Sequence, residues 1–130
     1  MSIRYLVAFG GLVTVLSLGV VAVAEEPRMP YVRIAELEID PARLESFKAS
    51  VKEEMDASVR VEPGVFAIYA VAEKDNPCKL KFFEIYADEA AYKSHRETAH
   101  FKKYAEATKN MIRSRNLIET IPVQLSEKKK

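Results

Sequence analysis

The residues best suited to chemistry lie close together in one stretch, "FFEIYADEAAYKSHRETAHFKKY", residues 82–104. It contains both histidines of the chain, His95 and His100, together with Glu84 and Tyr86. Imidazole titrates near neutrality, so His95 can pass a proton or donate a hydrogen bond to an oxyanion. Glu84 lies two residues from an aromatic ring on either side, and a buried carboxylate needs a partner. We expect that partner to be Arg33 or a histidine, although a purely structural role remains open for each residue.

The spacing of the two histidines argues against a shared metal ion. On an ideal helix, five residues turn the rings of His95 and His100 about 140° apart, so one ion can bind both only if the helix breaks. The sequence has no H-E-x-x-H pattern and no cluster of cysteines, and it lacks the glycine-rich and nucleophile motifs of nucleotide-binding folds and hydrolases. We therefore expect neither a metal nor a cofactor.

Hydrophobic periodicity predicts the elements that must position these residues. Residues 31–39 alternate like a strand, and Asp40 and Pro41 then begin a helix with apolar residues at helical spacing. Residues 61–64, "VEPG", end that helix, because proline disfavours a helical residue before it and Gly64 permits a turn.

The second half of the chain repeats this pattern. Strands are predicted over 65–72 and 80–87, separated by a polar turn. Asp88 begins a second helical region that runs to about Arg113, with a break near Thr98 left open. A last strand is predicted over 117–125, where Pro122 favours an edge position. The order is β-α-β-β-α-β, an α+β ferredoxin-like sheet with both helices on one face.

Both faces of the strand over 65–72 are apolar. Strict alternation puts Val65, Ala67, Tyr69 and Val71 on one face, and Phe66, Ile68, Ala70 and Ala72 on the other. Helices on one side cover only one of these faces. We expect a second copy of the chain to cover the other, giving a homodimer packed sheet against sheet.

Residues 1–24 are typical of an export signal, with Arg4 before an apolar stretch and A-x-A at residues 22–24. We expect cleavage to leave one domain, residues 25–130 with a core over 31–125, in the periplasm or secreted. An uncleaved membrane anchor is the alternative. Without the leader, basic and acidic residues are equal in number, which gives no reason to expect nucleic-acid binding. Cys78 has no partner for an intramolecular disulfide, and its role stays open.

The chain resembles the antibiotic biosynthesis monooxygenase (ABM) family, in particular its small quinol-monooxygenase-like members. The resemblance rests on "RVEPGVFAIYA" (60–70), on the stretch 82–104 and on the spacing between them, and it extends over roughly 31–125. It implies dimeric α+β barrels with a pocket between each sheet and its helices. It also implies a monooxygenase that needs no cofactor and acts on a small quinol or phenol with dioxygen.

The resemblance also implies roles for individual residues. His95 would be the base or donor, Glu84 its orienting partner, and Tyr86 and Tyr69 further donors. Phe82 and Phe101 would form aromatic walls, while His100 and Arg60 match other family positions. A dimer that binds a small molecule without turnover, an isomerase of a small metabolite and a purely structural dimer stay open. Haem degradation is less expected, since those members use a pocket tryptophan and this chain has none.

Overall fold

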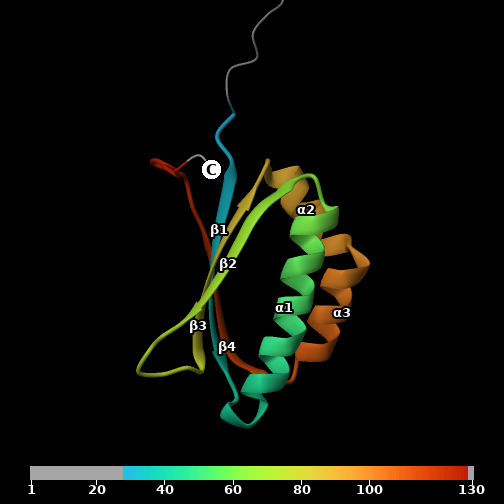
Figure 1. Ribbon diagram of the computed structural model, residues 1–130, viewed down its shortest axis with the longest axis vertical. Helices are drawn as coiled ribbons and strands as arrows, with labels where there is room; N and C mark the ends of the chain where they lie inside the picture. Colours follow the sequence, from blue (N-terminus) through green and yellow to red (C-terminus); the bar gives the residue numbers. More distant parts are fainter. Residues whose placement is uncertain (1–27, 129–130) are drawn as a thin grey trace, which may run out of the picture.

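The fold is a four-stranded antiparallel sheet with all its helices on one face (Figure 1). The computed structural model describes residues 28–128, so the predicted export signal lies outside the described residues. The sheet order is β2-β3-β1-β4. The elements are β1 Tyr31–Ile39, the 3₁₀ turn η1 Pro41–Arg43, α1 Leu44–Val61, β2 Val65–Ala72, β3 Lys79–Tyr86, α2 Glu89–Glu97, α3 Ala99–Thr108 and β4 Ile112–Glu119. The predicted α+β ferredoxin-like fold is confirmed.

Side-chain caps fix where the turn η1 and the helix α2 begin. The Asp40 carboxylate accepts from the Ala42 amide at 3.0 Å, ahead of the short turn that leads into α1. The Asp88 carboxylate accepts from the Ala91 amide at 2.8 Å and begins α2. Each cap satisfies an amide that has no partner within its own helix.

The second helical region is broken at Thr98, as the sequence allowed. Thr98 has extended backbone angles, φ −67° and ψ 153°, so α2 ends there. Its hydroxyl accepts from the Phe101 amide and begins α3, and it donates to the carbonyl of His95 at 2.7 Å. Because of this break, His95 and His100 do not belong to one continuous helix, and the ideal helical turn between them does not apply.

The predicted bounds of the last helix and strand are wrong. The helix ends at Thr108 rather than near Arg113, and β4 spans Ile112–Glu119 rather than 117–125. Residues 113–116, "RSRN", have no apolar alternation, yet residues 114–116 pair with β1, which no hydrophobic pattern reveals. Pro122 lies beyond the strand, although β4 does occupy a sheet edge as predicted.

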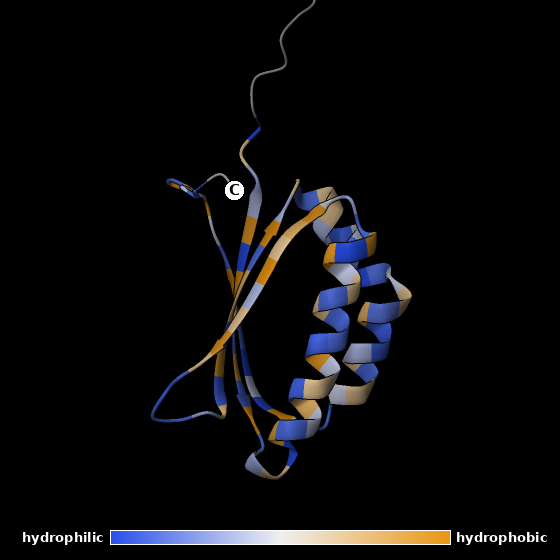
Figure 2. Ribbon diagram, viewed as in Figure 1, coloured by the Kyte–Doolittle hydropathy of each residue, from blue (hydrophilic) through white to orange (hydrophobic). Residues whose placement is uncertain are grey.

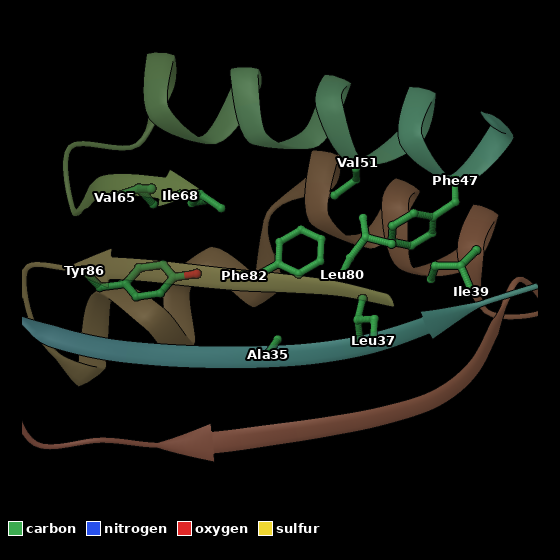
Figure 3. Packing of buried hydrophobic residues seen from close by; sticks show 10 residues of the cluster. All are labelled: Ala35, Leu37, Ile39, Phe47, Val51, Val65, Ile68, Leu80, Phe82 and Tyr86. Atoms are coloured by element: carbon green, nitrogen blue, oxygen red, sulfur yellow. The ribbon is translucent and has the colours of Figure 1, made fainter. Parts of the chain in front are cut away.

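The core fills the space between the inner face of the sheet and α1 (Figure 3). Phe47, Leu80 and Ile39 lie at one end of it and Tyr86 at the other. A register shift between Val65 and Ala67 turns both Val65 and Ile68 inward. The predicted pairing of Phe66 with Ile68 on one face is therefore wrong, because strict alternation takes no account of a bulge.

The outer face of the sheet carries exposed apolar side chains. Phe66, Tyr69 and Val71 on β2 are 55–62% exposed, and Phe83 on β3 lies beside them. β2 is coloured mostly hydrophobic along its length in Figure 2. The surplus apolar face predicted from the sequence is thus present. Within residues 28–128, no helix has the length and apolar character needed to cross a bilayer.

Candidate active site

A cavity of about 170 Å³ lies between the inner face of the sheet and the helices. β1 and β3 contribute polar groups to it, from Arg33, Glu84 and Tyr86. The helices add Glu54 from α1 and His95 from α2. The apolar and aromatic part of the wall is made by Val51, Ile68, Phe82, Tyr92, Phe101, Tyr104 and Leu117. A few convergent polar groups in a mainly apolar wall are typical of a small-molecule site.

Glu84 and Tyr86 form one hydrogen-bonded pair in the cavity wall. The Tyr86 hydroxyl donates to Glu84 Oε2 at 2.9 Å, and Tyr86 is fully buried. Burial raises the pKa of Glu84, against the opposing effects of the Tyr86 hydrogen bond and the charge of His95. Burial, together with the neighbouring Glu84 carboxylate, also raises the pKa of Tyr86. Glu84 is therefore a carboxyl group that holds a proton more readily than one in water.

Arg33 is the cross-strand neighbour of Glu84, but it bonds to other groups. Its guanidinium donates to the Tyr31 hydroxyl at 3.2 Å and to Glu119 at 3.0 Å, and it lies 4.6 Å from the centre of the Tyr92 ring. Burial alone would lower its pKa, but these partners outweigh burial and raise it. Arg33 thus supplies a fixed positive charge near Glu84, which holds the pKa of that carboxyl lower than burial alone would.

His95 is 3% exposed and has a carboxylate beside each ring nitrogen. Its Nδ1 is 2.9 Å from Glu62 Oε2, and its Nε2 is 3.4 Å from Glu54 Oε1. The ring also packs against Phe101, with centroids 5.0 Å apart, and against Tyr86. The hydrogen-bonding partner of His95 is therefore Glu62, with Glu54 on its other side, rather than Glu84 as the sequence suggested.

Glu62 joins the two histidines through one oxygen atom. The same Oε2 that faces His95 is 2.6 Å from His100 Nε2. Burial alone would raise the pKa of Glu62, but the hydrogen bonds and charges of the two histidines outweigh burial and lower it. Glu62 is thus held as a carboxylate, and through it the buried His95 is linked to the more exposed His100.

Glu54 completes the cluster from α1. It is 6% exposed, and the hydroxyl of the fully buried Ser58 lies 2.7 Å from its Oε1. Candidate metal-binding atoms of Glu54, His95 and His100 lie within 4.8 Å of one another. The expectation that the histidines cannot share an ion assumed a continuous helix, and the break at Thr98 removes that premise.

Comparison with known proteins agrees with this fold and cavity. The model of the family described as "Antibiotic biosynthesis monooxygenase" matches residues 30–107. A solved structure of a presumed antibiotic biosynthesis monooxygenase from Bacteroides thetaiotaomicron has 50% identity and a TM-score of 0.74, covering 78% of this chain and 96% of that one. The chain belongs to the antibiotic biosynthesis monooxygenase family.

More distant ABM relatives share the fold. A presumed monooxygenase from Lactobacillus acidophilus has 36% identity and a TM-score of 0.67, covering 68% of this chain and 42% of that chain. A Nitrosomonas europaea protein with 22% identity and a TM-score of 0.69, covering 72% of this chain and 99% of that one, shows similarity of fold alone. Comparison with curated proteins gives no match.

The structure gathers most of the residues predicted from the ABM resemblance. Glu84, Tyr86, His95, Phe82 and Phe101 all line the cavity. His100 does not line it, but it contacts Glu62 behind His95.

Two predicted residues lie away from the cavity. Tyr69 is 58% exposed and lies on the outer face of the sheet, opposite the helices. Arg60 is exposed in the last turn of α1. Neither residue is among those that line the cavity.

The sequence of this ABM protein did not predict the roles of three residues at the site: Glu54, Glu62 and Arg33. Glu54 follows Val51 by three residues, so it falls on the apolar stripe of α1, and a charge in that position is a usable signal. Glu62 belongs to the "EPG" turn and gave no such signal, because its contacts with α2 and α3 join residues 33 and 38 apart in the sequence. Arg33 was considered only as a partner for Glu84.

Proposed function

We propose that this ABM protein is a cofactor-independent monooxygenase that acts on a small quinol or phenol. One observation carries the proposal: a cavity with aromatic walls brings together His95 and a carboxyl group of raised pKa, Glu84. Family membership supports the monooxygenase assignment, and the size and polarity of the cavity support a small aromatic substrate.

The chemistry needs a base more than it needs a redox group. A deprotonated phenol or quinol can pass an electron directly to dioxygen, after which one oxygen atom forms a bond to the ring. A phenol and dioxygen give a quinone and water, and a quinol and dioxygen give a hydroxyquinone and water. Atoms and electrons balance in both reactions without a further reductant. The protein must therefore remove a proton, hold the ring and donate to the oxygen that develops negative charge.

His95 is placed to take the substrate proton. It lines the cavity, and its Nδ1 is held by Glu62. Glu62 also contacts His100, whose side chain is 21% exposed. We infer a route for the proton from the cavity through His95 and Glu62 to His100 and solvent. Glu84, when protonated, would donate from one of its carboxyl oxygens to an oxygen atom of the substrate. Its other carboxyl oxygen, Oε2, accepts from the Tyr86 hydroxyl.

Oxygen consumption with a soluble quinol tests this assignment. His95→Ala should lower kcat/KM about 10²-fold or more, because general base catalysis contributes roughly that factor. Glu84→Gln should also lower the rate, while Glu106→Gln, on the exposed surface of α3, serves as the matched control. The assignment of His95 would be wrong if His95→Ala consumed oxygen at the wild-type rate.

The same measurement separates turnover from simple binding. A protein that only sequesters the aromatic molecule would shift its absorbance spectrum while consuming no oxygen. That result, obtained with several quinols and phenols, would replace the enzymatic proposal with a binding function for the same cavity.

We further propose that the protein works as a homodimer and is exported to the periplasm or secreted. The exposed apolar outer face of the sheet supports the dimer. The pattern of the first 24 residues supports export, and it leaves membrane attachment open if the leader is not cleaved.

A further inference from the structure

The two histidines of the chain and one buried glutamate converge on a point beside the cavity. Glu54 comes from α1, His95 from α2 and His100 from α3, and candidate ligand atoms of the three lie within 4.8 Å of one another. Ligand atoms around a tetrahedral zinc ion, with bonds of about 2.0–2.2 Å, are roughly 3.4 Å apart. We propose that these three residues bind a divalent first-row transition metal ion of the Zn²⁺ class.

The donor set selects the class of metal. Two imidazoles and one carboxylate suit zinc and its transition-metal neighbours, whereas calcium and magnesium prefer oxygen ligands alone. His95 Nε2 and Glu54 Oε1 are already 3.4 Å apart, close to the spacing of neighbouring ligands around one ion.

The groups around these ligands match those that support a metal site. Metal-binding histidines usually donate their second ring N–H to a carboxylate, which leaves the other nitrogen free for the ion. Here His95 Nδ1 faces Glu62 Oε2 at 2.9 Å, which leaves Nε2 beside Glu54. The Ser58 hydroxyl, 2.7 Å from Glu54 Oε1, holds the carboxylate in turn.

His100 is the ligand that must move. Its Nε2 lies 2.6 Å from Glu62, and it would exchange this contact for the ion by turning its ring. At 21% exposure its side chain is less confined than those of Glu54 and His95, at 6% and 4%. Glu62 keeps its hydrogen bond to His95 and so continues to hold that ring.

A bound ion would lie at the cavity wall, since Glu54 and His95 both line the cavity. Three protein ligands leave a coordination position for water or another small ligand. The inference does not depend on the proposed oxygenase activity. Because the ion would occupy His95 Nε2, we expect Zn²⁺ to inhibit any proton transfer that uses this nitrogen.

Calorimetric titration of the chelator-treated protein with Zn²⁺ tests the site. The titration uses a Cys78→Ser background, because the free thiol is itself a zinc ligand. We expect one ion per chain, with affinity lowered at least tenfold by His100→Ala and by Glu54→Gln. Glu106→Gln, which removes an exposed carboxylate on α3, should bind Zn²⁺ with the affinity of the parent. Co²⁺ in the same site should give the intense visible absorption of a tetrahedral complex, and His100→Ala should lose it.

Two results would overturn the inference: no binding at micromolar Zn²⁺, or unchanged affinity in folded His100→Ala, which would place the ion elsewhere. Circular dichroism establishes that each variant is folded, and His100→Gln replaces His100→Ala if the latter is not. A protein that oxidises quinols but binds no Zn²⁺ would disprove this site and leave the proposed function intact. A protein that binds Zn²⁺ through these residues but oxidises no quinol would support the metal site and disprove the proposed function.

Discussion

Glu62 holds two histidines with a single carboxylate oxygen, and its protonation should therefore affect the whole cluster. The histidines lower its pKa below the ordinary value of 4.5. A carboxyl group with a lowered pKa stabilises the fold above its unfolded pKa, and this stabilisation is lost as pH falls through the folded pKa.

We expect Glu62→Gln to reduce the free energy of unfolding by about 2 kcal/mol at pH 7, since hydrogen bonds to charged groups contribute roughly that much. The variant should also lose less stability than the parent between about pH 5 and pH 3, because it lacks the titrating carboxylate. Urea unfolding at several pH values measures both effects. Glu106→Gln is the control. If Glu62→Gln and the parent lost the same free energy of unfolding as the pH fell, the lowered pKa of Glu62 would not contribute to stability as described.

For individual residues, the sequence predicted which ones line the cavity better than it predicted their hydrogen-bonding partners. His95, Glu84 and Tyr86 were recognised from residue type, alternation and family pattern, and all three line the cavity. The contact of His95 with Glu62 was missed, because it depends on the turn after α1 lying against α2. Pairings of this kind follow from tertiary packing, which local periodicity does not describe.

The elements around the site are held in place by a close approach at Gly64. A Cβ built on Gly64 would lie 2.6 Å from Cβ of Ala91 in α2, so the "EPG" turn packs directly onto that helix. The backbone of Gly64 has no positive φ, and what the position requires is space rather than unusual dihedral angles. The amide of Ala87 also donates to the Gly64 carbonyl at 2.9 Å. This contact places Glu62 next to His95.

Gly64→Ala should destabilise the fold by about 1–3 kcal/mol, the usual cost of overpacking, because α2 must move away. Thermal unfolding measures the loss. The double variant Gly64→Ala/Ala91→Gly removes the clash and should recover much of the stability, apart from about 1 kcal/mol for glycine in a helix. An unchanged melting temperature in Gly64→Ala would mean that the turn does not pack against α2 as described.

Element types were predicted well from periodicity and caps, and element ends less well. Asp40 and Asp88 were predicted as caps, and each side chain does cap an amide. Near Thr98 only a break was expected, and the structure adds that Thr98 caps α3. The start of β4 was missed because its polar residues pair with β1 through the backbone, without an apolar alternation to mark the strand. The bulge in β2 was missed for a similar reason, since a register shift leaves no mark in an apolar run.

The outer face of the sheet carries an exposed apolar patch on β2 and β3, and the proposed dimer depends on that patch. Tyr69→Lys or Phe83→Glu should convert a dimer into a monomer, because either change places a charge in the centre of the contact. Light scattering at micromolar concentration measures the mass. Lys52→Glu, on the exposed side of α1, should leave the mass unchanged. A wild-type protein that is monomeric throughout the accessible concentration range would disprove the dimer.

The proposed activity requires the cavity between the sheet and the helices to bind an aromatic substrate between His95 and the Glu84–Tyr86 pair. A crystal structure of the protein with a bound quinol or its quinone product tests it most directly. We predict the ring against Phe82 and Phe101, with one of its oxygen atoms within hydrogen-bonding distance of His95 or Glu84. A ligand found only on the outer face of the sheet, or a cavity filled by rearranged side chains at saturating ligand, would show that the cavity is not the substrate site.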